Sequence, residues 1–198
     1  LRLGVVENVR YQESVRVQRW IVESGHLGDI QMPAWWSIGS GEWSPDKIVA
    51  QTPWRHQKLL GGGGASLDIG VHWFHRLRYV VGEVESVFAQ TRICEPRRYR
   101  RSETGAIVDA VDCDVDDAFF ANVRFVNQAM GQLSFTWAGH GEVTNLPEGL
   151  VLYGSRGCLK GDRLVRDGGG VQSARALFAA HATDDDRERL FPFGLRDT

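Results

Sequence analysis

The longest helical pattern in the chain lies between residues 59 and 81. Apolar positions recur there at intervals of three and four, which predicts one buried helical stripe. These positions are Leu67, Val71, Phe74 and Leu77. Four glycines at 61–64 precede the stripe and allow the backbone to approach another group where the helix N-terminus presents free N–H donors. A second helix is expected over residues 12–24, with Gly25 as its C-terminal cap.

Alternating apolar and polar positions predict strands, most of them in the second half of the chain. The expected strands cover residues 3–9, 29–38, 84–94, 118–126, 129–138, 150–153, 158–160 and 164–166. Most are joined by short turns such as Asn127-Gln128, so we expect a largely antiparallel open β-sheet with the helices packed on one face, an α+β fold. The other face would carry large apolar side chains such as Phe120 and Trp137. A second copy of the chain is the simplest cover for them.

We expect one folded domain over residues 1–166 and a poorly structured tail over residues 167–198, which is rich in Gly, Ala and Asp. Residues 39–60 form a long connection that contains several Trp and Pro residues. Aromatic and Arg side chains in it either line a binding wall or anchor the loop to the core. The basic run at 97–101, followed by several aspartates, is expected to form a solvated hairpin or loop.

Composition excludes some classes of partner. The chain has 198 residues, 42% of them hydrophobic, and a net charge of −2, which creates no field favouring nucleic acid or an anionic membrane. It contains no apolar run of about 18 residues, the length that a transmembrane helix needs. Its three cysteines, Cys94, Cys113 and Cys158, form no CxxC pair and are expected to be free thiols in a reducing, cytoplasmic compartment. Because the chain lacks an initial Met, we expect it to begin inside a longer polypeptide.

Asp68 and His72 are the leading candidates for chemistry. Their spacing of four residues would place the two side chains one above the other on a helix. A stacked carboxylate can fix the tautomer of an imidazole and hold the ring as a proton acceptor. Such a pair is more often a plain ion pair, and the spacing of His72 and His75 also admits a metal site with Asp68. No further ligand is evident, so we expect no metal.

Several short segments, taken in order, resemble the C-terminal domain of the glucose–fructose oxidoreductase/inositol dehydrogenase (Gfo/Idh/MocA) family. The most specific is Gly62–Ala65 followed by Leu67–His72. The others are Glu7–Tyr11, Gly25–Gly28, Trp54-Arg55, Asp116–Ala118, the hairpin at Gly131 and Gly154–Leu159. The resemblance covers roughly residues 5–160 and implies a dihydrodipicolinate reductase-like α+β domain.

The resemblance also implies roles for particular residues. His72 would accept a proton from a substrate hydroxyl as hydride leaves the same carbon. Asp68 would orient His72 or hydrogen-bond a neighbouring hydroxyl. Candidates for the substrate-facing wall are Arg10, Tyr11, Trp54, Arg55 and His75, the last standing where the family usually has Asp.

By the same resemblance, the partner is a small sugar or polyol and the cofactor is NAD or NADP. The chain has no GxGxxG motif, and the family's N-terminal Rossmann domain is absent from it, so the chain alone is expected to be inactive. A homodimer or tetramer would form through the open sheet face. The alternative is a non-catalytic module for self-association or protein binding. The missing cofactor motif favours this alternative, whereas the presence of both Asp68 and His72 favours the enzyme.

Overall fold

The computed structural model describes residues 3–4, 7–39, 52–141 and 149–194. Its helices are η1 (Val9–Tyr11), α1 (Glu13–Glu23), η4 (Pro53–His56), α2 (Lys58–Gly61), α3 (Ala65–Asp68), α4 (Gly70–Val80), α5 (Ala174–His181) and α6 (Asp184–Leu190), of which η1 and η4 are 3-10 helices. Its strands are β1 (Ile30–Ile38), β2 (Val84–Arg92), β3 (Arg97–Arg101), β4 (Ile107–Asp112), β5 (Ala118–Phe125), β6 (Met130–Thr136), β7 (Gly149–Gly154), β8 (Gly157–Lys160), β9 (Arg163–Arg166) and β10 (Gly170–Ser173).

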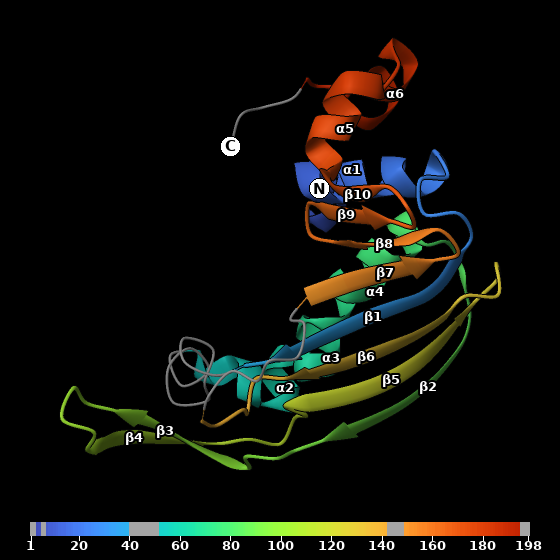
Figure 1. The fold of residues 1–198 in the computed structure, drawn as a ribbon. Helices are drawn as coiled ribbons and strands as arrows, with labels where there is room; N and C mark the ends of the chain where they lie inside the picture. Colours follow the sequence, from blue (N-terminus) through green and yellow to red (C-terminus); the bar gives the residue numbers. More distant parts are fainter. Residues whose placement is uncertain (1–2, 5–6, 40–51, 142–148, 195–198) are drawn as a thin grey trace.

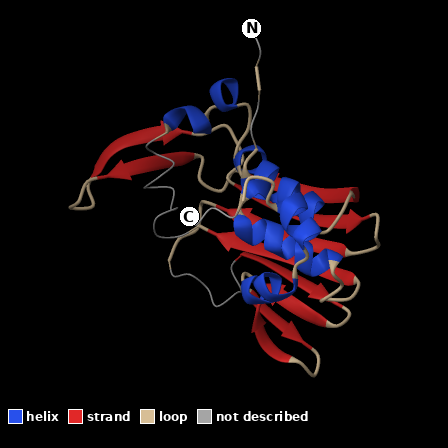
Figure 2. Cartoon of the chain, turned by 90° about the horizontal axis from the view of Figure 1, so that it is seen from above, coloured by secondary structure: helices blue, strands red, loops and turns tan. Residues whose placement is uncertain are grey.

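Eight strands form one sheet in the order β10-β9-β8-β7-β1-β6-β5-β2 (Figure 1). Strand β1 lies between β6 and β7 and pairs parallel with β6, whereas the other neighbouring strands pair antiparallel. The helices lie over one face of this sheet (Figure 2). The expected α+β fold, an open and largely antiparallel sheet covered by helices on one side, is therefore confirmed. The parallel pair makes the sheet mixed.

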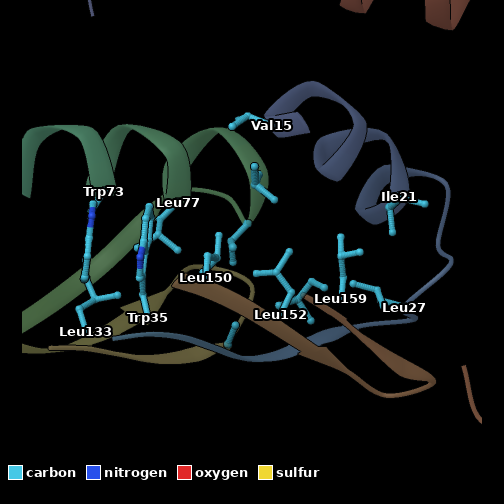
Figure 3. Packing of buried hydrophobic residues seen from close by; sticks show 14 of the residues in the cluster. Val15, Ile21, Leu27, Trp35, Trp73, Leu77, Leu133, Leu150, Leu152 and Leu159 are labelled. Atoms are coloured by element: carbon cyan, nitrogen blue, oxygen red, sulfur yellow. The ribbon is translucent and has the colours of Figure 1, made fainter. Parts of the chain in front are cut away.

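The core lies between this sheet and the helices (Figure 3). Trp73 of α4 stacks on Trp35 of β1, with ring centroids 4.1 Å apart and an angle of 8° between the planes. Leu77 of α4 and Leu133 of β6 are fully buried nearby. Further along the sheet, Ile21 of α1 packs in the same apolar layer. One continuous core therefore holds α1 and α4 on the sheet.

Helix α1 forms where its apolar spacing predicts it. Its residues Val17, Trp20 and Ile21 are all buried. Beyond its end, Gly25 has φ of +71°, and the His26 N–H donates to the Ile21 carbonyl over 3.1 Å. A glycine in the left-handed region followed by such a backward bond is a common helix ending.

The strand expected over residues 3–9 is wrong for the part of it that is described. Residues 3–4 and 7–8 have no regular secondary structure, and η1 begins at Val9. The Val9 N–H donates to the Glu7 carboxylate over 2.8 Å, and the Tyr11 N–H donates to the Asn8 carbonyl over 2.9 Å. These local bonds satisfy the backbone within the segment, so it needs no neighbouring strand.

The long helix expected within residues 59–81 is divided into α2, α3 and α4. Its buried stripe is also different from the expected one, because Leu67 is 53% and Val71 47% exposed. Of the expected stripe, Leu77 is buried and Phe74 is partly buried against the core. The buried side chains of α4 are Trp73, Leu77 and Val80. These three follow helical spacing as well, and the stacking of Trp73 on the sheet selects that face.

The expected hairpin after residue 95 is confirmed as β3 and β4, which form a separate two-stranded sheet that projects from the domain (Figure 1). One of its basic residues is not solvated, however. Arg98 is 1% exposed and donates to the buried Asp117 carboxylate over 2.7 Å. The burial of this one ion pair fastens the arm to the main sheet.

The expectation of a poorly structured tail from residue 167 is wrong for the residues described up to 194. Strand β10 extends the sheet, and α5 and α6 follow it. Phe178 of α5 meets Trp20 of α1 edge to face, with centroids 5.3 Å apart. A capping box formed by Thr183 and Asp186 begins α6. The weak periodicity of this segment reflects short helices that each bury only one or two large side chains.

The sheet face opposite the helices carries part of the expected apolar surface. Phe120 is 49% exposed there, but Trp137 is only 3% exposed. Trp137 lies just after the end of β6 and meets Phe135 edge to face in the core. The expectation is therefore right for Phe120 and wrong for Trp137, because alternation from the buried Leu133 and Phe135 places Trp137 on the helix-covered face.

Candidate functional site

The glycine-rich loop is held against the turn that precedes β5. A Cβ atom on Gly64 would lie 1.8 Å from the Asp116 carbonyl oxygen, so only glycine allows this approach. The Ala65 N–H donates to that carbonyl over 2.8 Å, and the Ser66 N–H donates to the Asp116 carboxylate over 2.7 Å. The group that the glycines approach is thus Asp116 of the same chain. Its oxygens accept hydrogen bonds from the backbone N–H groups at the start of α3.

A pocket of about 330 Å³ opens beside this loop, between η4, α3 and α4. It is lined by Trp54, Arg55, Gly61, Gly63, Leu67, Asp68, Val71 and His72. The structure therefore brings together four of the residues predicted for the site. Trp54 and Arg55 come from the long connection, where the sequence alone left a binding wall and a structural anchor equally open. Its residues 40–51, including Trp43 and Pro45, lie outside the described part of the chain.

Asp68 does not pair with His72. The Asp68 carboxylate accepts a hydrogen bond from the Arg55 guanidinium over 2.6 Å, and the two side chains are 32% and 38% exposed. Helix α3 ends at Asp68, and the next helical bonds, from the His72 and Trp73 N–H groups, both go to the Ile69 carbonyl. The expected stacking of Asp68 on His72 is thus replaced by an ion pair at the pocket edge, half open to solvent.

The carboxylate that contacts His72 belongs to Glu7. Glu7 Oε2 lies 2.5 Å from His72 Nδ1, and the side chains of Glu7 and His72 are 17% and 45% exposed. Burial of the Glu7 carboxylate opposes its ionisation, but the Val9 N–H, His72 and His75 together lower the pKa of Glu7 below its ordinary value. An ionised Glu7 accepts a hydrogen bond from a protonated Nδ1. In a neutral ring, Nε2 is then the nitrogen that can accept a hydrogen bond.

Sequence reasoning missed Glu7 as a site residue. It is 65 positions from His72, and no local spacing connects the two. The one signal available was that Glu7 opens a segment, Glu7–Tyr11, that carries the family resemblance. The α4 helix and the η1 helix that follows Glu7 pack against each other, and this tertiary contact creates the pair.

The other three predicted residues lie outside the lining of the pocket. Arg10 and Tyr11 are exposed on η1 and bond to each other, Arg10 Nη2 donating to the Tyr11 hydroxyl over 3.1 Å. Tyr11 lines a different hollow, beside Phe191. His75 is half-buried on α4 one turn after His72, and its Nε2 atom is buried with no hydrogen-bond partner among the described residues.

Within the described ranges, no group of three or more His, Cys, Asp and Glu side chains is arranged to hold a metal ion. Asp68 and His72 each have a different ion-pair partner. In the same ranges, no helix is long and apolar enough to cross a membrane.

Comparison with known proteins gives consistent matches. A family model described as "GFO/IDH/MocA C-terminal domain" matches residues 15–160. A levoglucosan dehydrogenase of Pseudarthrobacter phenanthrenivorans is 30% identical over 145 residues, 69% of this chain and 36% of that protein. A D-xylose dehydrogenase of Paenarthrobacter nicotinovorans is 29% identical over 137 residues, 68% of this chain and 34% of that protein. The chain thus spans about a third of the length of these curated relatives.

Solved structures share the fold. A levoglucosan dehydrogenase in complex with NADH and L-sorbose superposes with a TM-score of 0.63 and 24% identity, over 84% of this chain and 46% of that chain. An oxidoreductase from Agrobacterium radiobacter in complex with NAD+, L-tartaric acid and magnesium superposes with a TM-score of 0.64 and 18% identity, over 88% of this chain and 46% of that chain.

Proposed function

Since this chain belongs to the GFO/IDH/MocA C-terminal domain family, we propose that it is the substrate-binding and oligomerisation domain of an NAD(P)-dependent oxidoreductase. The substrate is a sugar, a polyol or a related small molecule, of which one hydroxyl is oxidised. The observation that carries the proposal is the placement of His72 in a pocket, with one ring nitrogen bound to a carboxylate and the other free of described partners. The relatives named above are sugar dehydrogenases, which supports this substrate class.

In this proposal, His72 Nε2 accepts the proton of the substrate hydroxyl. Nδ1 keeps its own proton and donates a hydrogen bond to the Glu7 carboxylate, so the ring passes from neutral to cationic beside a negative charge. Arg55 and Asp68 hold neighbouring hydroxyls, because their ion pair offers both N–H donors and carboxylate acceptors at the pocket edge. Trp54 and the half-exposed Leu67 and Val71 supply the apolar part of the wall.

NAD or NADP, when bound, would supply the hydride acceptor for the carbon that bears the reacting hydroxyl. Leu67 and Val71, which line the pocket, would offer the nicotinamide ring an apolar wall. The dinucleotide itself would be bound by a separate nucleotide-binding domain, because the chain has no GxGxxG motif. We therefore expect the 198-residue chain alone not to turn over substrate.

Replacement of His72 by Ala tests the catalytic role. In the full-length protein, assayed with sugars and polyols against NAD+ and NADP+, we expect His72→Ala to lower kcat by about 10²-fold or more. His140→Ala is a matched control, because His140 also contacts a carboxylate, that of Glu95 at 2.9 Å, but lies outside the pocket. Unchanged turnover of His72→Ala would contradict the proposal.

The open sheet face is the proposed surface for a homodimer or tetramer. Phe88, Phe120 and Met130 are 68%, 49% and 67% exposed. They lie on one face, because Phe88 is opposite Asn122 and Met130 is opposite Arg124, and positions 120, 122 and 124 alternate along β5. Exposed apolar side chains gathered on one sheet face are typical of an interface.

Light scattering tests this assembly. We expect the chain to be a dimer or larger and Phe120→Glu to dissociate it, while Phe193→Glu, at an 80% exposed position in the C-terminal segment, leaves it assembled. A wild-type monomer of 22.2 kDa would contradict the interface. It would equally weaken the alternative that the chain is a non-catalytic self-association module.

The expected compartment is the cytoplasm. Cys94, Cys113 and Cys158 are free thiols, and burial raises the pKa values of Cys94 and Cys113. Free cysteines of this kind are typical of a reducing compartment. Fractionation of source cells checks this expectation.

A further inference from the structure

We propose that Glu7 is a positioning residue for His72, one that sets which ring nitrogen faces the substrate. This inference rests on the proposed function, in which His72 is the proton acceptor. It adds a residue from the N-terminal segment of the domain to the reaction. Neither the spacing along the chain nor the lining of the pocket includes Glu7.

The burial of the two partners shows their arrangement. The Glu7 side chain is 17% exposed and that of His72 is 45% exposed, so the carboxylate is the more buried partner. The ring borders the pocket, whereas Glu7 does not. Glu7 therefore acts on the reaction through His72 and has no direct contact with a substrate in the pocket.

Both oxygens of the Glu7 carboxylate are in use, which fixes its orientation. Oε1 accepts the Val9 N–H over 2.8 Å, and Oε2 is 2.5 Å from His72 Nδ1. Val9 itself is 8% exposed, and its carbonyl accepts the Gln12 N–H. The carboxylate is thus attached to a helical turn that is anchored by the buried Val9 and packs against α4, and it presents a defined acceptor to the ring.

No other described acid competes for His72. Asp68, the nearest carboxylate on α3, is held by Arg55 over 2.6 Å. The remaining titratable group close to Glu7 is His75 on the same helix as His72, whose charge also favours an ionised Glu7. Two separate ion pairs thus stand at the pocket. His72, paired with Glu7, is the proposed base, and Arg55 with Asp68 forms a polar edge.

The contact has a chemical consequence. A proton on Nδ1 is held by Glu7, so the lone pair of Nε2 is directed away from the carboxylate and is available to the substrate hydroxyl. When the hydroxyl proton moves to Nε2, the resulting imidazolium stays next to the negative charge of Glu7. Without Glu7, the ring would rotate or change tautomer and would present a protonated nitrogen for part of the time.

Two substitutions test this assignment in the full-length protein. Glu7→Ala removes the acceptor, and we expect kcat to fall about 10- to 100-fold with KM nearly unchanged, by analogy with the loss of carboxylate partners of metal-bound histidines. Glu7→Gln keeps the shape and an acceptor oxygen without the charge and should recover part of the loss. Glu95→Gln is the matched control. Glu95 likewise contacts a histidine, His140, at 2.9 Å, but neither residue lines this pocket.

A second readout does not depend on turnover. In the 198-residue chain, the ¹⁵N NMR signals of His72 should report a proton on Nδ1 at neutral pH, and Glu7→Ala should abolish this preference while the melting transition persists. Retention of the Nδ1–H tautomer in a folded Glu7→Ala protein, or a kcat within about twofold of wild type, would overturn the inference. If His72→Ala leaves turnover unchanged, the proposed function fails. If His72→Ala is inactive and Glu7→Ala is fully active, only the role of Glu7 fails.

Discussion

Replacing Asp117 by Ala tests whether the projecting arm is fastened to the domain by one buried ion pair. Asp117 and Arg98 both have fully buried side chains. The Asp117 carboxylate accepts the N–H groups of Cys94 and Glu95 over 2.7 and 2.8 Å, and the Arg98 guanidinium over 2.7 Å. The guanidinium also lies over the Trp137 ring, 5.7 Å from its centroid. Every one of the three hydrogen bonds depends on the carboxylate.

The expected loss is large because removal of Asp117 leaves a charge buried. Breaking a buried ion pair by deleting one partner destabilises by about 3–5 kcal/mol. Each of the two backbone donors left without an acceptor adds about 1–3 kcal/mol, less what entering water restores. We expect Asp117→Ala to lower the free energy of unfolding by about 4–6 kcal/mol, a large part of the 5–15 kcal/mol typical of a domain.

Urea unfolding, followed by tryptophan fluorescence and circular dichroism, measures this loss. The double variant Asp117→Asn with Arg98→Met should be less destabilised than Asp117→Ala, because it removes the buried charge together with its partner. Glu83→Ala is the surface control, since Glu83 and Arg78 are 65% and 58% exposed, and it should change stability by less than about 1 kcal/mol. A loss below about 2 kcal/mol for Asp117→Ala would refute the reasoning.

Three further predictions concern the tail, the glycine loop and acid stability. Phe178→Ala should lower the free energy of unfolding by about 3–5 kcal/mol, measured by urea unfolding, because Phe178 is 2% exposed; a change below about 1 kcal/mol would mean that the C-terminal helices do not belong to the cooperative fold. Gly64→Ala should misfold or strongly destabilise the chain, because its Cβ would lie 1.8 Å from the Asp116 carbonyl; a normal melting temperature would contradict that contact. The hydrogen bond from the Thr183 hydroxyl lowers the pKa of Asp186, so its stabilisation is present above the unfolded-state value of about 3.9 and is lost as pH falls through the lower folded pKa. Between about pH 6 and pH 3, wild type should therefore lose more stability than Asp186→Asn in urea titrations, and equal losses would argue against the capping box.

The family resemblance read from short ordered segments is confirmed by the family match over residues 15–160. These segments include glycines and turns whose requirements are local. The hairpin turn at Asn127-Gln128, for example, joins adjacent antiparallel strands, and Gln128 takes a positive φ of 72°. Helix α1 likewise depends on spacing within 11 residues. Such features could be predicted because a hydrogen bond or a buried stripe a few residues apart decides them.

The candidate site could be predicted only in part. Trp54, Arg55, Asp68 and His72 do line one pocket. Which of these side chains pair with one another was not predictable. Arg55 and Asp68 are 13 residues apart in the sequence, and Glu7 and His72 are 65 residues apart. An i, i+4 rule compares only neighbours on an unbroken helix, whereas this helix ends at Asp68 and begins again at Gly70.

Periodicity, turn residues and short motifs act over a few positions, so the class of the fold, most of its hairpins and four of the residues that line the pocket could be predicted from the chain alone. Tertiary structure decided the rest. Stacking of Trp73 on Trp35 selected the buried face of α4, and this left Val71 half exposed at the pocket. Contact between the N-terminal turn and α4 supplied the carboxylate for His72. The physical reason is that several faces of a short amphipathic helix and several carboxylates can satisfy the local rules, and only the packing of distant segments, which removes water from one of these arrangements, selects among them.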